Sequence, residues 1–536
     1  MGMMGRINWK YQISFILAIF LLSACNYQKF INPNFRVTYP SLNQKVHMDS
    51  LKTAYLKVHV KDGSVYLLDC WELAKSNEFL SGTGKKFNYN RSLIREGDFE
   101  IPVTDIVIME TNNIQSIKSL DMDKYASLAV FTILNALGGI MCLSNPKACF
   151  GSCPTFYIDD DVNAHLFSAD AEGFSEAIAP SLERWDLDAL QCQQGGGQLV
   201  KLWMKNEAQE THAVNTVNLM AVPKMPGKHI FHDKDNVFYE CGDLINPVFA
   251  EGPEGSILGS VQFIDDKERR SLSDSTDLTE KEIIELEFDA TGMTSPALVI
   301  NFRQTLLTTF LLYSGLSYMG DEMSDVFARM QMDKRVNEVF GAPFKKIKFI
   351  EVWIEEGKPG NWIKTYEFGE TGPIAWNQQV VPLPYHLNAK DSKLRVKLVM
   401  TKGLWRIDYL ALADISATVE PIRLFPAFVK SSNGEDSHLV SDLSQDDNRY
   451  LASFPGDVFE LGFVLPYQAE SYELFLLTSG YYLEWIRPEW LKEKDIGKLK
   501  KLVLNDKAAW ESLALEYKSV EAEMESVFWN SKLFMP

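Results

Sequence analysis

The strictest pattern in the chain is a strand-like alternation in the stretch Leu394–Met400, LRVKLVM. Apolar residues occupy every second position, and Arg395 and Lys397 lie between them. A period of two residues places one set of side chains on a buried face of a β-sheet and the other set in water. The chain therefore contains at least one sheet with a dry side and a wet side, as β-sandwiches do.

Further strands are predicted on both sides of this stretch, at residues 347–354 and 362–368. The run GLWRIDYLALADI begins at Gly403. It is similar to the last strand of galactose-binding-like β-sandwiches, in which glycine, an aromatic residue, aspartate and alternating aliphatic residues also follow one another. This resemblance implies a β-sandwich over residues 345–425.

The rest of the chain is predicted to be mainly β with helical insertions, an α+β architecture of several domains. At 536 residues the chain is too long for one core, and two to four domains are expected. A small β-barrel-like domain is predicted at 51–118, where Leu56, Val58 and Val60 alternate and Asp62-Gly63 forms a hairpin turn. The remaining predicted parts are a β domain at 150–290, a helical segment at 295–341, β strands at 440–495 and a C-terminal helix at 500–536.

The C-terminal helix carries an apolar series with alternating spacings of three and four residues, formed by Trp510, Leu513, Tyr517, Val520, Met524 and Val527. This spacing is that of a heptad seam on one helix face. We expect a terminal helix that docks on the body of the protein. The alternative is a seam between two copies of the chain.

A second apolar stretch, Tyr125–Leu143, has no charged residue and lies in a predicted helix at 120–145. Its length is sufficient for a membrane span, which needs about 20 apolar residues. Two interpretations stay open, a membrane span and a buried or membrane-leaning helix that breaks near Gly138-Gly139.

The N-terminus has the features of a secretory signal. Arg6 and Lys10 precede an apolar run from Ile13 to Leu22, which is too short to span a bilayer. The ending Leu-Ser-Ala-Cys at Cys25 resembles the lipobox of bacterial lipoproteins. The resemblance implies that residues 1–24 are a signal peptide, that Cys25 carries the lipid, and that 25–50 is a tether. It also implies a cell-envelope protein held on the membrane by its N-terminal lipid, and Asn26 favours the outer membrane. The alternative is an ordinary anchor helix.

The cysteines fit an exported protein. One of the seven is Cys25, and the other six form an even set: Cys70, Cys142, Cys149, Cys153, Cys192 and Cys241. An even number in an oxidising compartment permits disulfides. Cys149 and Cys153 are the candidate pair, and the alternatives are buried thiols, a metal site or a redox centre. The net charge of −19 argues against a nucleic-acid partner.

Standard catalytic motifs are absent from the sequence. It has no phosphate-binding glycine loop, zinc-protease helix or nucleophile elbow, so we predict no catalytic residue, no cofactor and no metal. The sequence contains three weaker candidates: an acidic cluster for calcium, a histidine pair for a metal, and paired carboxylates for glycoside cleavage. These are, in order, Asp159, Asp160, Asp161 and Asp170; His229 and His232 with Asp233; and Glu183 with Asp186 or Glu207 with Glu210.

Two short elements resemble those of uncharacterised multi-domain bacterial surface lipoproteins. The first is Ser-Cys-Pro-x-x-Tyr and the second is Leu-Glu-Arg-x-Asp, here Ser152, Cys153, Pro154 and Tyr157, then Leu182, Glu183, Arg184 and Asp186. The resemblance covers residues 150–490 loosely. It implies a β-rich envelope protein and supplies no catalytic residues.

The sequence thus predicts a lipid-anchored envelope protein that binds carbohydrate or a partner protein. Four tryptophans are candidates for stacking on a sugar: Trp353, Trp362, Trp376 and Trp405. The alternatives are a structural component of an envelope complex, docked through its C-terminal helix, and a hydrolase. A carbohydrate binder should present at least two of the tryptophans on one sheet face, and a structural component should expose an apolar stripe along 510–527.

Overall fold

The computed structural model describes residues 56–111, 153–158 and 169–531. Within these ranges, residues 61–63, 75–77, 88–92, 180–181, 209, 266, 321–325, 327–340, 342–344, 370–371, 385–392, 433, 445–449, 454–455, 485–489 and 491 are not described. The predicted signal peptide, tether and apolar helix, with Cys25, Cys149 and Asp159–Asp161, lie outside the described residues. The chain divides into two compact units, Met1–Leu120 with Ser324–Ala328 and Asp121–Met323 with Arg329–Pro536.

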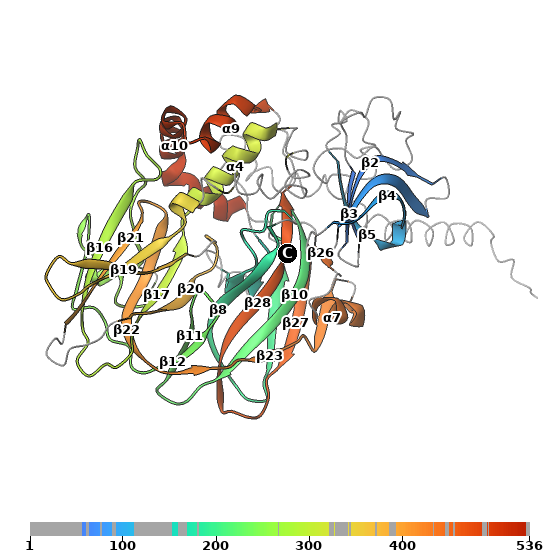
Figure 1. Ribbon diagram of the computed structural model, residues 1–536. Helices are drawn as coiled ribbons and strands as arrows, with labels where there is room; N and C mark the ends of the chain where they lie inside the picture. Colours follow the sequence, from blue (N-terminus) through green and yellow to red (C-terminus); the bar gives the residue numbers. More distant parts are fainter. Residues whose placement is uncertain are drawn as a thin grey trace, which may run out of the picture. The chain divides into compact units, whose positions relative to one another are not determined.

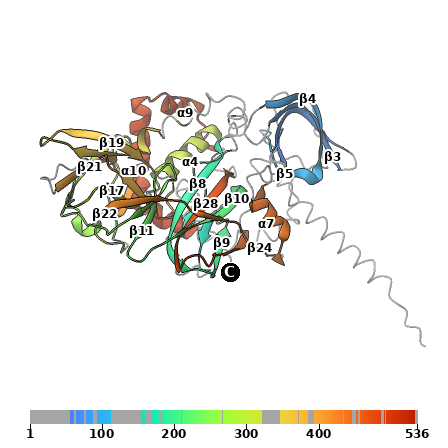
Figure 2. The same ribbon diagram turned by 60° about the horizontal axis from the view of Figure 1, so that its bottom comes forward.

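The N-terminal unit is one antiparallel sheet with the strand order β4-β3-β2-β1-β5. Its strands are β1 (Leu56–Val60), β2 (Val65–Leu73), β3 (Phe79–Phe87), β4 (Leu93–Pro102) and β5 (Ile106–Thr111). Figure 2 shows the sheet strongly curved, which closes its inner face around a small core. Leu56, Val58, Leu68, Leu80 and Ile101 are buried there. The alternation in β1 thus points one side of the strand into this core, as the sequence predicts.

The strands at the beginning and at the end of the second unit form one β-sandwich, which we call the first sandwich. One of its sheets has the order β25-β24-β27-β9-β6-β7, and the other has the order β23-β10-β28-β8 with β26 also paired to β10. The strands are β6 (Thr155–Tyr157), β7 (Ala171–Glu172), β8 (Arg184–Gly195), β9 (Leu199–Lys205), β10 (Glu210–Pro223), β23 (Ile422–Leu424), β24 (Phe428–Ser431), β25 (Gly434–Glu435), β26 (Leu451–Ser453), β27 (Val458–Val464) and β28 (Ser471–Glu484). The sheets are joined where the Glu172 N–H donates to the Asp188 carboxylate and Tyr482 donates to the Ser175 carbonyl.

The second sandwich is formed entirely from the residues between β10 and β23. One sheet has the order β12-β11-β20-β17-β22-β15 and the other has the order β14-β13-β16-β21-β18-β19. The strands are β11 (His229–His232), β12 (Phe238–Cys241), β13 (Phe249–Gly252), β14 (Gly255–Ser256), β15 (Arg269–Arg270), β16 (Lys281–Asp289), β17 (Pro296–Gln304), β18 (Ile350–Glu355), β19 (Trp362–Phe368), β20 (Asn377–Pro382), β21 (Lys393–Thr401) and β22 (Trp405–Val419). Apolar side chains from both sheets share one core.

The second sandwich is therefore an insertion in the first. Figure 1 shows the green β10 beside the red β28, although more than two hundred residues separate them in the chain. The two strands pair from Glu210↔Glu484 to Pro223↔Tyr472. The ranges predicted as separate β domains, 150–290, 345–425 and 440–495, thus share sheets. The galactose-binding-like segment is completed by β13, β16 and β17, which precede it.

The predicted helical segment at 295–341 needs correction at its start. Pro296–Gln304 is the strand β17 and all nine of its residues are buried, while the helix α4 covers Leu307–Met319. A strand that is buried on both faces loses its alternation and reads as a continuous apolar run. The apolar pattern of this run is therefore indistinguishable from that of the helix that follows it.

The C-terminal helices α9 (Ile496–Val503) and α10 (Lys507–Ser531) pack beside α4 on the second sandwich. Trp510, Leu513, Tyr517 and Met524 belong to the same buried core cluster as the sheet residues, so the prediction of a docked terminal helix is confirmed. These four residues of the apolar stripe expected of a structural component are covered by the protein itself, and Val520 is partly buried against them. None of the helices in the described ranges combines the length and the apolar character that a membrane crossing needs.

Candidate functional site

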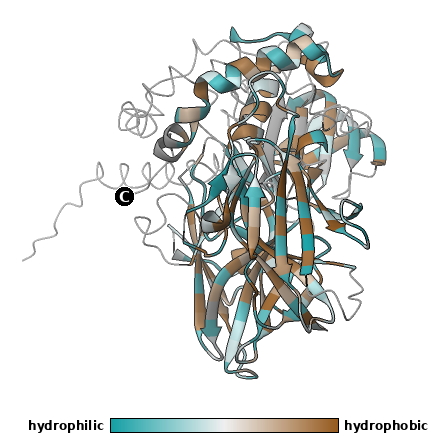
Figure 3. Ribbon diagram, turned by 90° about the vertical axis from the view of Figure 1, so that its left-hand side faces the viewer, coloured by the Kyte–Doolittle hydropathy of each residue, from teal (hydrophilic) through white to brown (hydrophobic). Residues whose placement is uncertain are grey.

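The alternation along Leu394–Met400 places basic side chains on the outer face of the second sandwich. In β21 the residues Leu394, Val396, Leu398 and Met400 are buried, whereas Arg395 and Lys397 are half-buried on the opposite face. Figure 3 looks toward this part of the molecule and shows hydrophilic and hydrophobic segments alternating along the strands. The sheet thus has the dry and wet sides that its sequence predicts.

Two tryptophans join these basic residues on the same face. In β18, Trp353 is half-buried between the buried Val352 and Ile354, and it pairs with Lys397 of β21 on one side and Lys364 of β19 on the other. Trp362 of β19 lies opposite Glu355 of β18. We call the set Trp353, Trp362, Lys364, Arg395 and Lys397 the aromatic–basic face.

A β-bulge decides that Trp362 belongs to this face. The register of β18 and β19 shifts between Val352 and Trp353, where Thr365 is the extra residue of β19. The Thr365 hydroxyl donates to the Val352 carbonyl at 3.2 Å. A shift by one residue turns side chains to the opposite side of a sheet, so the bulge brings Lys364 and Trp362 to the outer face beside Trp353.

The carboxylates of the face are engaged by two of its cations. Arg395 lies 2.8 Å from Glu285 and 2.9 Å from Glu355. Lys364 lies 2.9 Å from Glu351 and 2.8 Å from Glu367. Each cation thus bridges two acidic residues.

Lys397 differs from these two cations. Its ammonium lies 4.5 Å from the centre of the Trp362 ring and 5.2 Å from the Trp353 ring. The Arg395 guanidinium also lies 5.3 Å from the Trp362 ring. Such contacts are cation–π interactions, which hold indoles and cations together at solvent-exposed sites. The two rings are therefore gathered around one ammonium group.

Hydrogen bonds keep the paired groups of this face charged. Burial would raise the pKa of Glu351, but hydrogen bonds from Lys364 and the Trp353 indole N–H outweigh it and hold that pKa below its ordinary value. Hydrogen bonds to Glu367 and Glu351 raise the pKa of Lys364. Both groups are thus ionised at neutral pH, and the ion pair persists there.

The other two candidate tryptophans lie elsewhere. Trp405 has 0% of its surface exposed and packs against Phe302 in the core of the second sandwich, so its prediction as a ligand-facing residue is wrong. Its strand β22 is buried on both faces over its first nine residues. Trp376 is half-buried just before β20, with the Arg303 guanidinium 4.9 Å from its ring. It is not part of the aromatic–basic face.

The cysteines of the described residues are free thiols: Cys70, Cys153, Cys192 and Cys241. Cys153 is buried, and its candidate partner Cys149 lies outside the described residues, so the disulfide between them stays a prediction. Burial, with nearby carboxylates, raises the pKa of Cys153 and raises those of Cys192 and Cys241 to about 12. These three thiols are therefore protonated and weak as nucleophiles at neutral pH.

The candidate carboxylate pairs for catalysis lie inside the first sandwich. Glu207 and Glu210 are 3% and 0% exposed. Glu207 accepts hydrogen bonds from Tyr157 and Thr155, and Glu210 contacts His212 at 2.7 Å. A polysaccharide has no access to such buried groups, so these two carboxylates cannot act on one as a pair.

The remaining candidates also have structural partners. Glu183 accepts a hydrogen bond from the Tyr450 hydroxyl at 2.8 Å. His232 is buried and its ring bonds the Asp233 carbonyl at 3.0 Å, and Asp170 accepts from the Ile158 N–H at 2.8 Å. No group of three or more metal-ligating side chains occurs among the residues that the structure describes.

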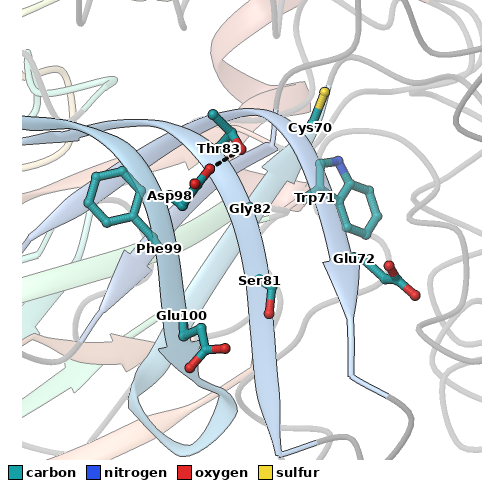
Figure 4. Close-up of a pocket in the computed structure, with 9 residues that line it drawn as sticks. All are labelled: Cys70, Trp71, Glu72, Ser81, Gly82, Thr83, Asp98, Phe99 and Glu100. Carbon is teal, nitrogen blue, oxygen red and sulfur yellow. Dashed lines mark hydrogen bonds between the residues drawn. The ribbon is translucent and has the colours of Figure 1, made fainter.

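The N-terminal unit has a hollow of about 500 Å³ on its curved sheet. Figure 4 shows its lining, which comes from the neighbouring strands β2, β3 and β4 and includes Trp71, Glu72 and Glu100. The Thr83 hydroxyl donates to the Asp98 carboxylate at 2.6 Å across this lining. No local sequence pattern marks this hollow, because its lining residues come from three separate strands.

Comparison of the chain with protein-family models and with curated proteins finds no match in either case. The site is therefore interpreted from its own chemistry.

Proposed function

We propose that the protein is a lipid-anchored component of the cell envelope that binds carbohydrate through the aromatic–basic face. The observation that carries the proposal is the placement of Trp353 and Trp362 on one solvent-facing side of a β-sandwich sheet. The anchor at Cys25 and the outer-membrane location are supported by the lipobox-like N-terminus alone. The role is binding and not catalysis.

The chemistry of the face suits a sugar. A pyranose ring has an apolar side of C–H groups that packs on the flat, electron-rich face of an indole, while its hydroxyls need hydrogen-bonding groups around the ring. Trp353 and Trp362 supply the flat surfaces, and Glu351, Glu355 and Lys364 supply the polar rim. The site is rigid because its side chains stand on paired strands of one sheet.

The proposal is tested by binding of the purified protein to a panel of soluble polysaccharides, measured by affinity electrophoresis. The variants Trp353→Ala and Trp362→Ala should each lose binding by about fivefold or more, because the stacking of a flat ring on an aromatic side chain is worth about 1–3 kcal/mol where it has been measured for nucleobases. Ile363→Ala is the matched control, since Ile363 neighbours Trp362 on β19 and is 40% exposed. Retention of polysaccharide binding by a Trp353→Ala/Trp362→Ala double variant would contradict the proposal.

The alternative of a structural component has less support. It relies on the C-terminal seam as a docking surface, and Leu513 and Tyr517 of that seam are each 2% exposed. A seam used for internal packing is not available to a partner unless α10 detaches. The carbohydrate proposal needs no such rearrangement.

A further inference from the structure

We propose that the aromatic–basic face selects negatively charged glycans, and that Lys397 is the residue that pairs with the acidic group of the sugar. This inference rests on the proposed carbohydrate binding and adds the class of ligand. A sugar carboxylate, as in a uronate, is the simplest group of this kind.

The first argument comes from the balance of charges on the face. Arg395 engages Glu285 and Glu355, Lys364 engages Glu351 and Glu367, and Lys393 lies 2.5 Å from Glu287. These five glutamates thus share three cations. Lys397, in contrast, forms no ion pair or hydrogen bond with any residue in the described part of the chain.

The second argument comes from position. The Lys397 ammonium lies against both indole rings, at 4.5 Å and 5.2 Å from their centres. A sugar that stacks on either tryptophan consequently has this ammonium beside it. Trp353 already donates its indole N–H to Glu351 at 3.1 Å, and Lys364 and Arg395 are held by glutamates, so Lys397 is the cation of the face best placed to pair with a charged ligand group.

The third argument concerns selectivity. An ammonium that is half-buried between two aromatic rings has given up part of its hydration, and a carboxylate restores that lost interaction with a charge-assisted hydrogen bond. A hydroxyl of a neutral sugar makes a weaker bond at the same place. The face should therefore bind an acidic sugar more tightly than the corresponding neutral one.

The test compares polygalacturonate with its methyl ester, in which the same polymer has lost its negative charges. Binding is measured at physiological ionic strength, where a screening length of about 8 Å suppresses the long-range repulsion from the protein's net charge of −19 and leaves contact pairs intact. The wild-type protein should prefer polygalacturonate by about five- to tenfold, the factor that corresponds to replacing a neutral hydrogen bond by a charge-assisted one.

Lys397→Met should abolish that preference, so that the ratio of polygalacturonate binding to methyl-ester binding falls to about one. Lys393→Met is the matched control, because it removes the same charge from the same strand but from a lysine that is already paired with Glu287. The thermal unfolding midpoint of each variant checks that the fold is intact. A preference that persists in Lys397→Met would overturn the assignment of this lysine.

The two proposals fail differently. Equal binding of polygalacturonate and its ester by the wild-type protein, with loss of both in Trp353→Ala, would overturn the acidic selectivity and leave carbohydrate binding standing. Absence of binding to every polysaccharide in the panel would overturn both proposals.

Discussion

Arg269 of β15 joins a buried carboxylate of the second sandwich, Glu282, to an exposed one, Glu254. Its guanidinium lies 2.7 Å from Glu282 and 2.7 Å from Glu254, and Arg269 and Glu282 are each 3% exposed. Burial would lower the pKa of Arg269, but its hydrogen bonds to the two glutamates outweigh burial and raise it. The Ser271 hydroxyl completes the group by donating to Glu282 at 2.8 Å. Because Arg269 and Glu282 are both removed from water, each charged side chain depends on the other for its stabilisation.

Replacement of Arg269 by methionine should lower the free energy of unfolding by about 3–5 kcal/mol, because Glu282 is left buried without its cation. The double variant Arg269→Met/Glu282→Met should regain most of this loss, since a pair of apolar side chains has no charge to desolvate. Urea unfolding followed by circular dichroism measures both. Equal destabilisation in the single and double variants would show that shape, and not the uncompensated charge, is responsible.

The tryptophans show how far residue-level prediction reaches. Alternation alone identifies Arg395 and Lys397 as outward-facing residues, and the structure agrees. Alternation cannot assign Trp362, because its side is set by the bulge at Thr365, nor Trp405, because its strand is buried on both faces. The grouping of Trp353, Trp362 and Lys397 also depends on pairing between β19, β18 and β21, which local sequence does not specify.

At the scale of elements, α10 is held by an apolar side and a polar side. Leu513, Tyr517 and Met524 enter the core of the second sandwich, and the Tyr517 ring lies 5.0 Å from that of Phe310 in α4. The Glu521 carboxylate accepts from the Ser273 N–H at 2.7 Å, and Lys518 donates to the Ser273 carbonyl at 3.1 Å. The helix thus covers the end of the sandwich and fixes a loop there.

Leu513→Ala should destabilise the protein by about 2–5 kcal/mol, the cost of a cavity in a packed core. Leu515→Ala is the matched control on the same helix, because Leu515 is 63% exposed and its loss should change stability by less than about 0.5 kcal/mol. Chemical unfolding of both variants measures the difference. Similar effects at the two positions would mean that α10 does not pack on the sandwich as the structure has it.

The elements also show what local patterns miss. The strands β16 and β21 have one wet face and alternate clearly, so sequence reasoning finds strands of this kind. β17 and most of β10 are buried on both sides, and the apolar run at Pro296–Gln304 falls within the stretch for which the sequence predicts a helix. Strand and helix cannot be told apart by periodicity when no face meets water.

At the scale of the whole molecule, the insertion of one sandwich in the other is beyond the reach of sequence. The first sandwich depends on the pairing of β10 with β28, and no local signal connects strands that far apart. The inserted sandwich is bonded to its host. Gln191 donates to the Asn301 side chain at 3.1 Å, and the Ile374 N–H donates to Glu172 at 3.2 Å. Apolar residues of both sandwiches also share a buried cluster that includes Leu187, Ile230, Phe238 and Phe475.

These shared contacts predict two thermal transitions for the protein. The two sandwiches should unfold together as one cooperative body, while the N-terminal unit has its own core and should unfold separately. The N-terminal transition should be several-fold smaller, because unfolding enthalpy scales with chain length at about 0.7 kcal/mol per residue near 60 °C. Leu68→Ala, in the core of the N-terminal unit, should lower the midpoint of the small transition alone, and Leu513→Ala that of the large one alone. Scanning calorimetry resolves the two, and a third transition would show that the sandwiches unfold independently despite the bonds that join them.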